Sequence, residues 1–251
     1  MVLVLTGGGS GKNTEEIDKY FASLINKKKP LLYIPIAIDT IKHPYPECLK
    51  WLKQTFDKLG INKYEMVTEE TISKYADKAP NNYGGVYIGG GNTPYLLKKI
   101  KESGIISFIE KAVEQNIPIY GGSAGAIIFG KTIKSSLKVD KNWVNITDFT
   151  GLNKTHGWDI WCHYTPEHQK NLEIGFLDAR SGSQTLRHDK IISEFMTKNK
   201  DVDKLIVLSE RNVIIVSKEN IENIEIIGQE PAMFIYNGSR KTVQVGEKIK
   251  S

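Results

Sequence analysis

Cysteine, arginine and long apolar runs are all scarce in this chain of 251 residues. Its two cysteines, Cys48 and Cys162, are too few for a disulfide framework, and both stand in apolar patterns typical of buried side chains. No apolar run approaches the roughly 18 residues that span a bilayer, which argues against a membrane protein. The N-terminus has no basic residues before its short apolar run, so no signal peptide is expected and a cytoplasmic location is predicted.

The net charge of +5 comes mainly from lysine, because arginine occurs at only four positions. The lysines are dispersed along the chain, which is typical of a solvated surface, so nucleic-acid binding is not predicted. The histidines lack the H-E-x-x-H spacing of a zinc site, and the chain has no thiolate cluster. We therefore expect neither a metal nor an organic cofactor.

Short apolar segments alternate with helical patterns through the first half of the chain, which predicts βαβ units and a mainly parallel sheet. The predicted strands are Val2–Thr6, Leu31–Ile36, Tyr64–Thr68, Gly85–Ile88 and Ile117–Tyr120. Glycine-rich turns follow the first, fourth and fifth of these strands. In such folds, ligands bind at the carboxyl ends of the strands, so these turns predict the place of the site.

The second half of the chain changes to a pattern of antiparallel strands. Leu205–Leu208 and Val213–Val216 flank a polar turn and are predicted to pair, and Asn237-Gly238 marks a later hairpin. We expect these strands to extend the same sheet. No linker or repeat divides the sequence, so residues 1–251 are predicted to form one α/β domain, a three-layer sandwich.

One segment carries a recognisable catalytic pattern, because Gly121-Gly122-Ser123-Ala124-Gly125 fits G-x-S-x-G between an apolar strand and a helical pattern. In this context the serine lies on a tight, strained turn with its hydroxyl exposed. The N–H of Ala124 would then face a developing oxyanion at the positive end of the helix. Ser123 is therefore the candidate nucleophile, and a plain glycine-rich turn is the alternative.

A serine nucleophile needs a base, and the chain has five histidines. His163 lies in an apolar, strand-like segment, where the end of a strand can hold an imidazole rigidly. His156 and His168 stand next to glycine or near proline in expected loops and are weaker candidates. Cys162 is adjacent to His163, so its side chain points to the opposite face of the strand, which argues against a Cys–His dyad.

The base in turn needs a carboxylate that orients its imidazole. Asp140 lies between Ser123 and His163 along the chain and is the preferred candidate. Asp148 and Asp159 lie in the same interval and compete with it. Any of the three can instead be an aspartate of a turn.

Two segments resemble peptidase family S51, which contains dipeptidase E and the cyanophycinases. Residues 88–97, with the sequence IGGGNTPYLL, are similar to its glycine-rich loop, and residues 121–126, GGSAGA, are similar to its nucleophile elbow. Residues 161–164 resemble the segment that ends in the family's catalytic histidine and a tyrosine, and residues 186–191 resemble an arginine-containing helix start. Looser similarity extends to about Val216.

The resemblance implies an α/β fold akin to the class I glutamine amidotransferases and hydrolysis of short peptides, in dipeptidase E those with an N-terminal aspartate. The segment around the acid departs from the family's pattern. The implied site residues are Ser123 as nucleophile, His163 as base, Asp140 as acid, Gly90 and Ala124 as oxyanion-hole donors, and Asn92 and Arg187 as substrate contacts, the arginine being the candidate partner of an acidic side chain.

Several alternatives remain within and outside this family. A cyanophycinase-like hydrolase of aspartyl-arginine peptides and a catalytically inactive binding module share the fold. A P-loop is excluded because Thr6 and Asn13 stand where Walker A requires glycine and Ser or Thr. In a conventional α/β-hydrolase the histidine comes late in the chain, whereas no histidine follows His188. The expected partners are a short peptide substrate and, as a homodimer, a second copy of the chain.

Overall fold

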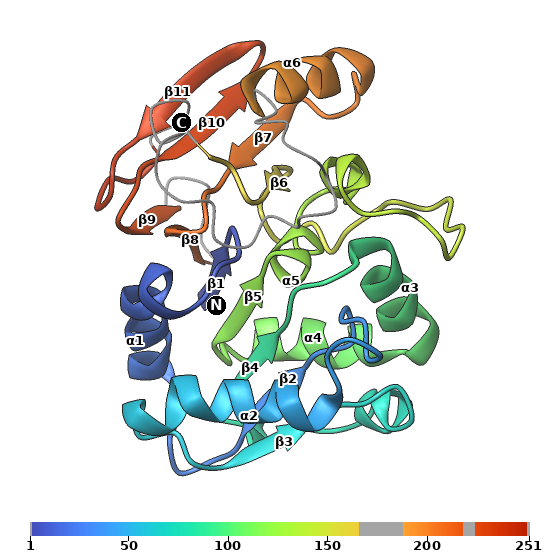
Figure 1. Ribbon diagram of the computed structural model, residues 1–251, viewed down its shortest axis with the longest axis vertical. Helices are drawn as coiled ribbons and strands as arrows, with labels where there is room; N and C mark the ends of the chain where they lie inside the picture. Colours follow the sequence, from blue (N-terminus) through green and yellow to red (C-terminus); the bar gives the residue numbers. More distant parts are fainter. Residues whose placement is uncertain (1, 166–187, 218–223, 250–251) are drawn as a thin grey trace.

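The computed structural model describes residues 2–165, 188–217 and 224–249. Its central sheet has seven strands in the order β3-β2-β4-β5-β1-β8-β9 (Figure 1). The strands are β1 (Val2–Thr6), β2 (Leu31–Ile34), β3 (Tyr64–Met66), β4 (Gly85–Ile88), β5 (Ile119–Gly122), β8 (Asn212–Ser217) and β9 (Glu225–Gly228). The first five are parallel to one another, and β8 and β9 continue the sheet as antiparallel strands. The prediction of a mainly parallel sheet with antiparallel additions is therefore confirmed.

Helices cover both faces of this sheet. They are α1 (Glu15–Leu24), α2 (Tyr45–Phe56), α3 (Thr93–Ser103), α4 (Ile105–Glu114) and α5 (Ala124–Ile127), whereas α6 (His188–Lys198) packs on a second, smaller sheet. Short 3₁₀ helices lie at η1 (Gly11–Asn13), η2 (Asp57–Leu59), η3 (Ile72–Tyr75), η4 (Pro80–Asn82) and η5 (Lys134–Lys138). Within the described ranges, none of the helices has the length and apolar character that crossing a bilayer requires.

Alternation along the strands produces the two cores of the sandwich. In β1, Leu3 and Leu5 point into the core shared with α3, α4 and α5, whereas Val4 points into the core shared with α1 and α2. Both sets of side chains are fully buried. A parallel sheet that is apolar on both faces needs a helical layer on each side, which explains the three-layer arrangement.

A second sheet departs from the prediction for the C-terminal half. Its four strands, in the order β11-β10-β7-β6, are β6 (Asp159–Trp161), β7 (Lys204–Val207), β10 (Ala232–Tyr236) and β11 (Ser239–Val243). The predicted pairing of 205–208 with 213–216 is wrong, because β7 lies in this sheet and β8 lies in the central one. Of the described C-terminal strands, only β8 and β9 extend the central sheet, and α6 packs on the small sheet through Ile192 and Phe195. The chain crosses from one sheet to the other through residues 208–211.

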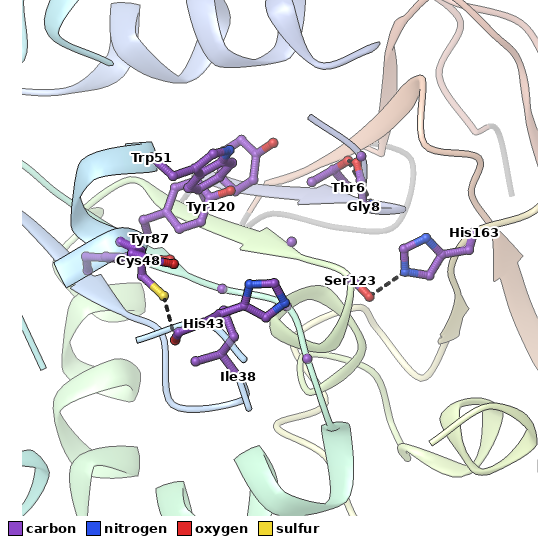
Figure 2. Close-up of a pocket in the computed structure, with 17 residues that line it drawn as sticks. Thr6, Gly8, Ile38, His43, Cys48, Trp51, Tyr87, Tyr120, Ser123 and His163 are labelled. Carbon is purple, nitrogen blue, oxygen red and sulfur yellow. Dashed lines mark hydrogen bonds between the residues drawn. The ribbon is translucent and has the colours of Figure 1, made fainter. Parts of the chain in front are cut away.

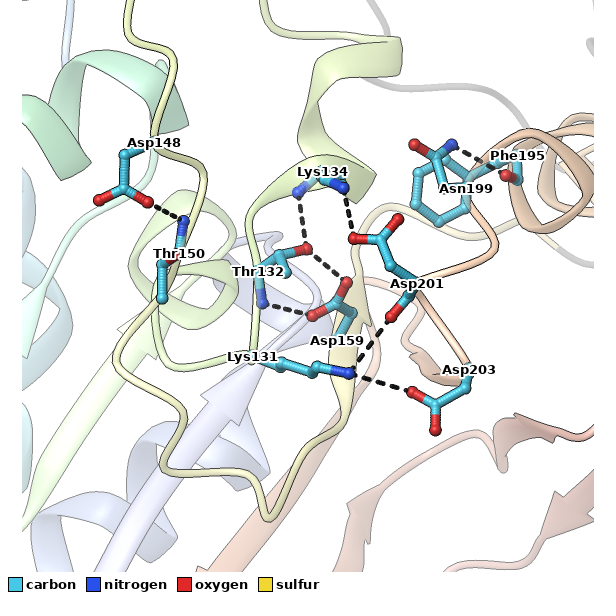
Figure 3. A network of polar contacts seen from close by, with 10 residues as sticks. All are labelled: Lys131, Thr132, Lys134, Asp148, Thr150, Asp159, Phe195, Asn199, Asp201 and Asp203. Carbon is cyan, nitrogen blue, oxygen red and sulfur yellow. Dashed lines mark hydrogen bonds and ion pairs between the residues drawn. The ribbon is translucent and has the colours of Figure 1, made fainter.

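Asp159, at the start of β6, is a buried carboxylate surrounded by a charged network (Figure 3). It accepts hydrogen bonds from the Thr132 backbone N–H and hydroxyl, both at 2.6 Å. Around it, Lys131 donates to Asp203 at 3.3 Å, and Lys134 forms an ion pair with Asp201. Burial raises the pKa of Asp159 to about 6, and the Thr132 hydrogen bonds oppose that shift.

Replacing Asp159 with asparagine should remove a pH dependence of stability. The pKa of Asp159 is higher in the folded protein than in the unfolded chain. Its favourable contribution to the free energy of unfolding is therefore complete below pH 4 and is lost as the pH rises through 6. The shift corresponds to roughly 3 kcal/mol at most. In urea unfolding, Asp159→Asn should therefore gain stability relative to wild type between pH 4 and pH 7.5, because asparagine can keep both bonds to Thr132.

Asp201→Asn is the matched control in the same network. Asp201 is exposed, and its hydrogen bond with Lys134 lowers its pKa, so its smaller contribution is lost as the pH falls. The two variants should therefore change the pH dependence in opposite directions. An Asp159→Asn variant that tracks wild type from pH 4 to pH 7.5 would contradict the assignment of a raised pKa.

Candidate active site

Ser123 lies between β5 and α5 in a backbone conformation that few residues adopt, with φ of 51° and ψ of −111°. Such strain is typical of a nucleophile elbow, because it projects the side chain away from the sheet at the carboxyl end of a strand. The backbone N–H of Ser123 donates to the Thr6 carbonyl at 3.1 Å, which fixes the turn against the end of β1. The predicted strand, turn and helix around Ser123 are therefore present.

The glycines that flank the serine are required by close backbone packing. A Cβ atom on Gly125 would lie 2.2 Å from the Ile88 carbonyl oxygen, and one on Gly121 would lie 2.4 Å from the Gly125 carbonyl oxygen. Neither contact is sterically possible. The glycines of the G-x-S-x-G pattern are therefore required by packing, because the backbone of α5 lies directly against the end of β4.

His163 is the side chain that meets the serine hydroxyl. Its Nε2 lies 2.7 Å from Ser123 Oγ, and its backbone N–H donates to the Gly7 carbonyl at 3.1 Å (Figure 2). The residue lies two positions after the end of β6 and has a φ of 57°, so its backbone turns sharply just beyond the strand. The two residues predicted as nucleophile and base are thus within hydrogen-bonding distance.

Glu210 is the acid that contacts the histidine, and the sequence prediction missed it. Its Oε1 lies 2.8 Å from His163 Nδ1, and both side chains are about one third exposed. Glu210 lies on the crossover between β7 and β8, which runs against the glycine loop after β1. A Cβ on Gly9 would lie 2.7 Å from the Glu210 carbonyl oxygen, so the glycines of this loop admit the acid-bearing segment.

Asp140 does not occupy the position predicted for it. Its Oδ2 accepts hydrogen bonds from the backbone N–H and the hydroxyl of Thr93, at 3.0 and 2.6 Å. These bonds fix the first residue of α3, just beyond the glycine-rich loop that ends at Gly91. Burial raises the pKa of Asp140, and the Thr93 hydrogen bonds oppose that shift. This geometry does not support the prediction of Asp140 as the orienting acid, because the carboxylate that contacts His163 Nδ1 is that of Glu210.

The two competing aspartates also lie elsewhere. Asp148 forms an ion pair with Lys101 at 2.6 Å, and Asp159 is bound to Thr132 in the network described above. Of the weaker histidine candidates, His156 is exposed on a turn and His168 lies outside the described residues.

The two predicted substrate contacts have different outcomes. Asn92 caps α3, because its Oδ1 accepts from the Tyr95 N–H at 2.9 Å while its Nδ2 donates to the Lys141 carbonyl at 2.9 Å. Both ends of the amide are thus engaged in holding the loop, and this geometry does not support a substrate contact. Arg187 lies outside the described residues.

Gly90 and Ala124, the predicted oxyanion donors, both lie beside Ser123. A Cβ on Gly90 would lie 3.2 Å from the Cβ of Ser123 and 3.8 Å from its Oγ, so this backbone passes directly beside the nucleophile. Ala124 is the first residue of α5, and the N–H groups of a first helical turn have no acceptor inside the helix. Both assignments remain predictions, and this geometry agrees with them.

Ser123 and His163 open into a cavity of about 500 Å³ (Figure 2). The glycine turns after β1, β4 and β5 meet in its wall, as the sequence predicts for the carboxyl edge of the sheet. His43 and Glu47 also line it, although neither was singled out in the sequence. They come from the segment between β2 and the middle of α2, and only their position after the second strand could have suggested them.

Replacing Gly8 with alanine should disable the site while preserving the fold. A Cβ on Gly8 would lie 2.4 Å from His163 Cε1, and the glycine φ of 113° adds backbone strain. Because a displacement of about 1 Å can cost 100-fold in rate, we expect kcat to fall at least that much with near-normal far-UV circular dichroism. Gly11→Ala is the control: it lies in the same loop at positive φ, but its Cβ would meet nothing within 4 Å. Equal losses in both variants would attribute the effect to the loop backbone.

Comparison with known proteins places this geometry in a family context. The sequence profile of peptidase family S51 matches residues 3–224. Peptidase E of Shewanella denitrificans is 26% identical over 145 residues, which make up 58% of this chain and 58% of that protein. Peptidase E of a Nostoc species is 27% identical over 151 residues, or 60% of this chain and 57% of that protein. The chain thus spans less than three fifths of the length of these two relatives.

Two solved structures have the same fold. A peptidase from an acI-B1 Actinobacterium aligns with a TM-score of 0.66 at 16% identity, covering 100% of this chain and 96% of its own. A Listeria monocytogenes EGD-e protein assigned to peptidase E aligns with a TM-score of 0.63 at 18% identity, covering 91% and 98%. At these identities the likeness establishes the fold, and the class predicted from the sequence is confirmed.

Proposed function

Because the chain belongs to peptidase family S51, we propose that it hydrolyses short peptides as a serine peptidase. The observation that carries the proposal is the continuous chain from Ser123 Oγ through His163 to Glu210, with contacts of 2.7 and 2.8 Å. A carboxylate on Nδ1 favours the tautomer whose Nε2 is free to accept the serine proton. Ser123 and His163 line one cavity, and Glu210 contacts the histidine from a third, separate part of the chain.

The proposed reaction begins when Ser123 Oγ attacks the scissile carbonyl and its proton passes to His163 Nε2. Glu210 stabilises the imidazolium, and the N–H groups of Gly90 and Ala124 bind the oxyanion. The tetrahedral intermediate then collapses, the peptide C–N bond breaks, and the imidazolium gives its proton to the leaving amine. A water molecule, deprotonated by His163, hydrolyses the acyl-enzyme and restores the serine.

The aspartyl preference implied by the resemblance is left out of this proposal. A carboxylate side chain in a substrate is best held by an arginine. Among the described residues that line the cavity there is no lysine or arginine, and the candidate Arg187 lies outside them. The proposal therefore covers hydrolysis of short peptides and does not specify a preference for substrates with an acidic side chain.

Purified protein assayed on a dipeptide panel tests the function directly. The panel includes Asp-X peptides, β-aspartyl-arginine and dipeptides of neutral residues, with release of free amino acids as the readout. We expect turnover of at least one class, and full activity in EDTA because the proposed reaction uses no metal. Binding without turnover would favour the inactive binding module, and turnover only on addition of metal would contradict the serine mechanism.

A further inference from the structure

The end of the cavity farthest from His163 is built from aromatic rings. Tyr33, Tyr87 and Tyr120 line it and are nearly inaccessible, and Trp51 of α2 adds a half-buried indole. Tyr87 and Tyr120 stack with their centroids 4.4 Å apart, while Tyr33 and Trp51 meet Tyr87 edge-on at 5.6 and 6.1 Å. Such interlocked rings form a rigid surface that exists before a ligand arrives. We refer to these four residues as the aromatic pocket.

The aromatic pocket begins directly beside the nucleophile. A Cβ on Gly122 would lie 3.7 Å from the Tyr87 hydroxyl and 3.7 Å from the Tyr120 ring, which are ordinary contact distances. Similarly, a Cβ on Gly89 would lie 3.5 Å from the Tyr33 ring. Neither glycine places a side chain against these rings, so the rings and Ser123 face the same cavity with no side chain of these two residues between them.

The charge around the aromatic pocket does not suit an anionic side chain. Glu47 is the one Asp or Glu among the described residues lining the cavity, and they include neither lysine nor arginine. Lys42 lines an adjoining hollow, where it forms an ion pair with Asp39 at 3.4 Å. Burial raises the pKa of Tyr33 and Tyr87 above the ordinary value, so these phenols stay neutral at physiological pH. Among the described residues that line the cavity, a buried carboxylate would therefore find no lysine or arginine as its partner.

The position of His163 indicates which residue of the substrate enters the aromatic pocket. Figure 2 shows the imidazole on one side of Ser123 and the labelled Trp51 and Tyr87 on the other. In the proposed reaction His163 protonates the leaving amine, so the amine lies on the imidazole side. The side chain on the acyl side then points toward the aromatic pocket.

We propose that the aromatic pocket binds an uncharged aromatic or long aliphatic side chain of the residue whose carbonyl Ser123 attacks, which makes such residues preferred over aspartate. This inference rests on the proposed peptidase function. Burial of such a side chain contributes about 10- to 150-fold in kcat/KM over alanine, the range expected for full burial of a large apolar group.

Dipeptides of the form X-Gly test the pocket because they vary only the acyl residue. With X as Phe, Leu, Ala, Asn, Asp or Arg, we expect Phe and Leu to exceed Ala at least tenfold in kcat/KM, and Asn to exceed Asp. Fastest cleavage of Asp-Gly, or rates equal within threefold, would overturn the proposal. Fastest cleavage of Arg-Gly would also overturn it, because the rings and Glu47 would then bind a cationic side chain. Cleavage of no X-Gly peptide, with no labelling of Ser123, would refute the peptidase function itself.

Variants of wall residues provide a second test. Trp51→Ala should lower the ratio of kcat/KM for Phe-Gly to that for Ala-Gly about tenfold, because part of the ring surface is lost. Trp143→Ala is the matched control, since Trp143 is exposed, stacks on Tyr95 and lines the adjoining hollow rather than the aromatic pocket, so the ratio should not change. Equal ratios in wild type and Trp51→Ala would contradict the pocket assignment. The wild-type X-Gly series decides the proposal if Trp51→Ala fails to fold.

Discussion

Replacement of Ser123 by alanine is expected to lower kcat by about five to six powers of ten, because no covalent route remains. The residual rate would come from the oxyanion donors and from substrate binding. Ser123 projects from a strained turn, and its hydroxyl contacts His163 without helping to hold the backbone. The variant should therefore fold normally, and progress curves at high enzyme concentration will measure the remaining turnover.

The result discriminates between a nucleophile and a serine that only polarises the substrate. KM should change little compared with kcat, because the cavity walls remain. A reduction of less than 100-fold in kcat would show that another group attacks the carbonyl. A Ser123→Cys variant provides a further check, since a thiol at the same position can still be activated by the imidazole.

Glu210→Gln is expected to reduce kcat by about 10³ to 10⁴, while Asp140→Asn reduces it by less than tenfold. Glutamine can donate to His163 Nδ1, which favours the wrong tautomer and leaves Nε2 protonated and unable to accept the serine proton. Asparagine at position 140 keeps an acceptor for the Thr93 N–H and hydroxyl, so the start of α3 should stay in place. The two variants each replace one carboxylate with an amide of the same shape, and steady-state kinetics on one dipeptide compares them.

The opposite ranking would restore the first assignment of the acid. If Asp140→Asn lost 10³-fold or more while Glu210→Gln stayed within tenfold, the contact between Glu210 and His163 would not be the catalytic one. Comparable large losses in both would indicate that catalysis also depends on the Asp140–Thr93 contact, through the position of the glycine-rich loop that ends at Gly91. Thermal unfolding of both variants separates these effects from loss of fold.

The sequence was sufficient for those parts of the site that depend on local patterns. The turn around Ser123 could be predicted because the glycine pattern that its close backbone packing requires stands within five consecutive residues of the sequence. His163 could be predicted because it lies in a short apolar, strand-like segment, and the structure places it two residues beyond the end of β6. The carboxyl edge of the parallel sheet followed from the alternation of strands and helices, and the glycine turns do meet there.

The acid could not be predicted because its position depends on a contact between two sheets. The sequence pattern at residues 205–208 and 213–216 is that of a hairpin. In the structure, however, the Leu208 N–H donates to the Trp161 carbonyl at the end of β6, and β8 pairs with β1. Glu210 lies at the resulting crossover rather than at an ordinary turn. The acid was expected between Ser123 and His163 along the chain, whereas Glu210 comes 47 residues after the histidine. Its one sequence signal was a carboxylate just after a predicted strand end.

The aromatic pocket could not be predicted from the sequence for a related reason. Tyr33, Tyr87 and Tyr120 lie in three different strands, and each alone is typical of a buried core residue. Their convergence depends on the register of β2, β4 and β5, where Tyr33, Tyr87 and Tyr120 are aligned partners. Period-two alternation predicts which face each tyrosine takes, but pairing register is a property of the folded sheet.

Reaction with a fluorophosphonate, followed by peptide mapping in a mass spectrometer, tests the central claim most directly. The account predicts one covalent adduct on the Ser123 hydroxyl, formed rapidly in wild type, much more slowly in Glu210→Gln, and at close to the wild-type rate in Asp140→Asn. An adduct on a different residue, or none on Ser123 in the folded protein, would contradict it.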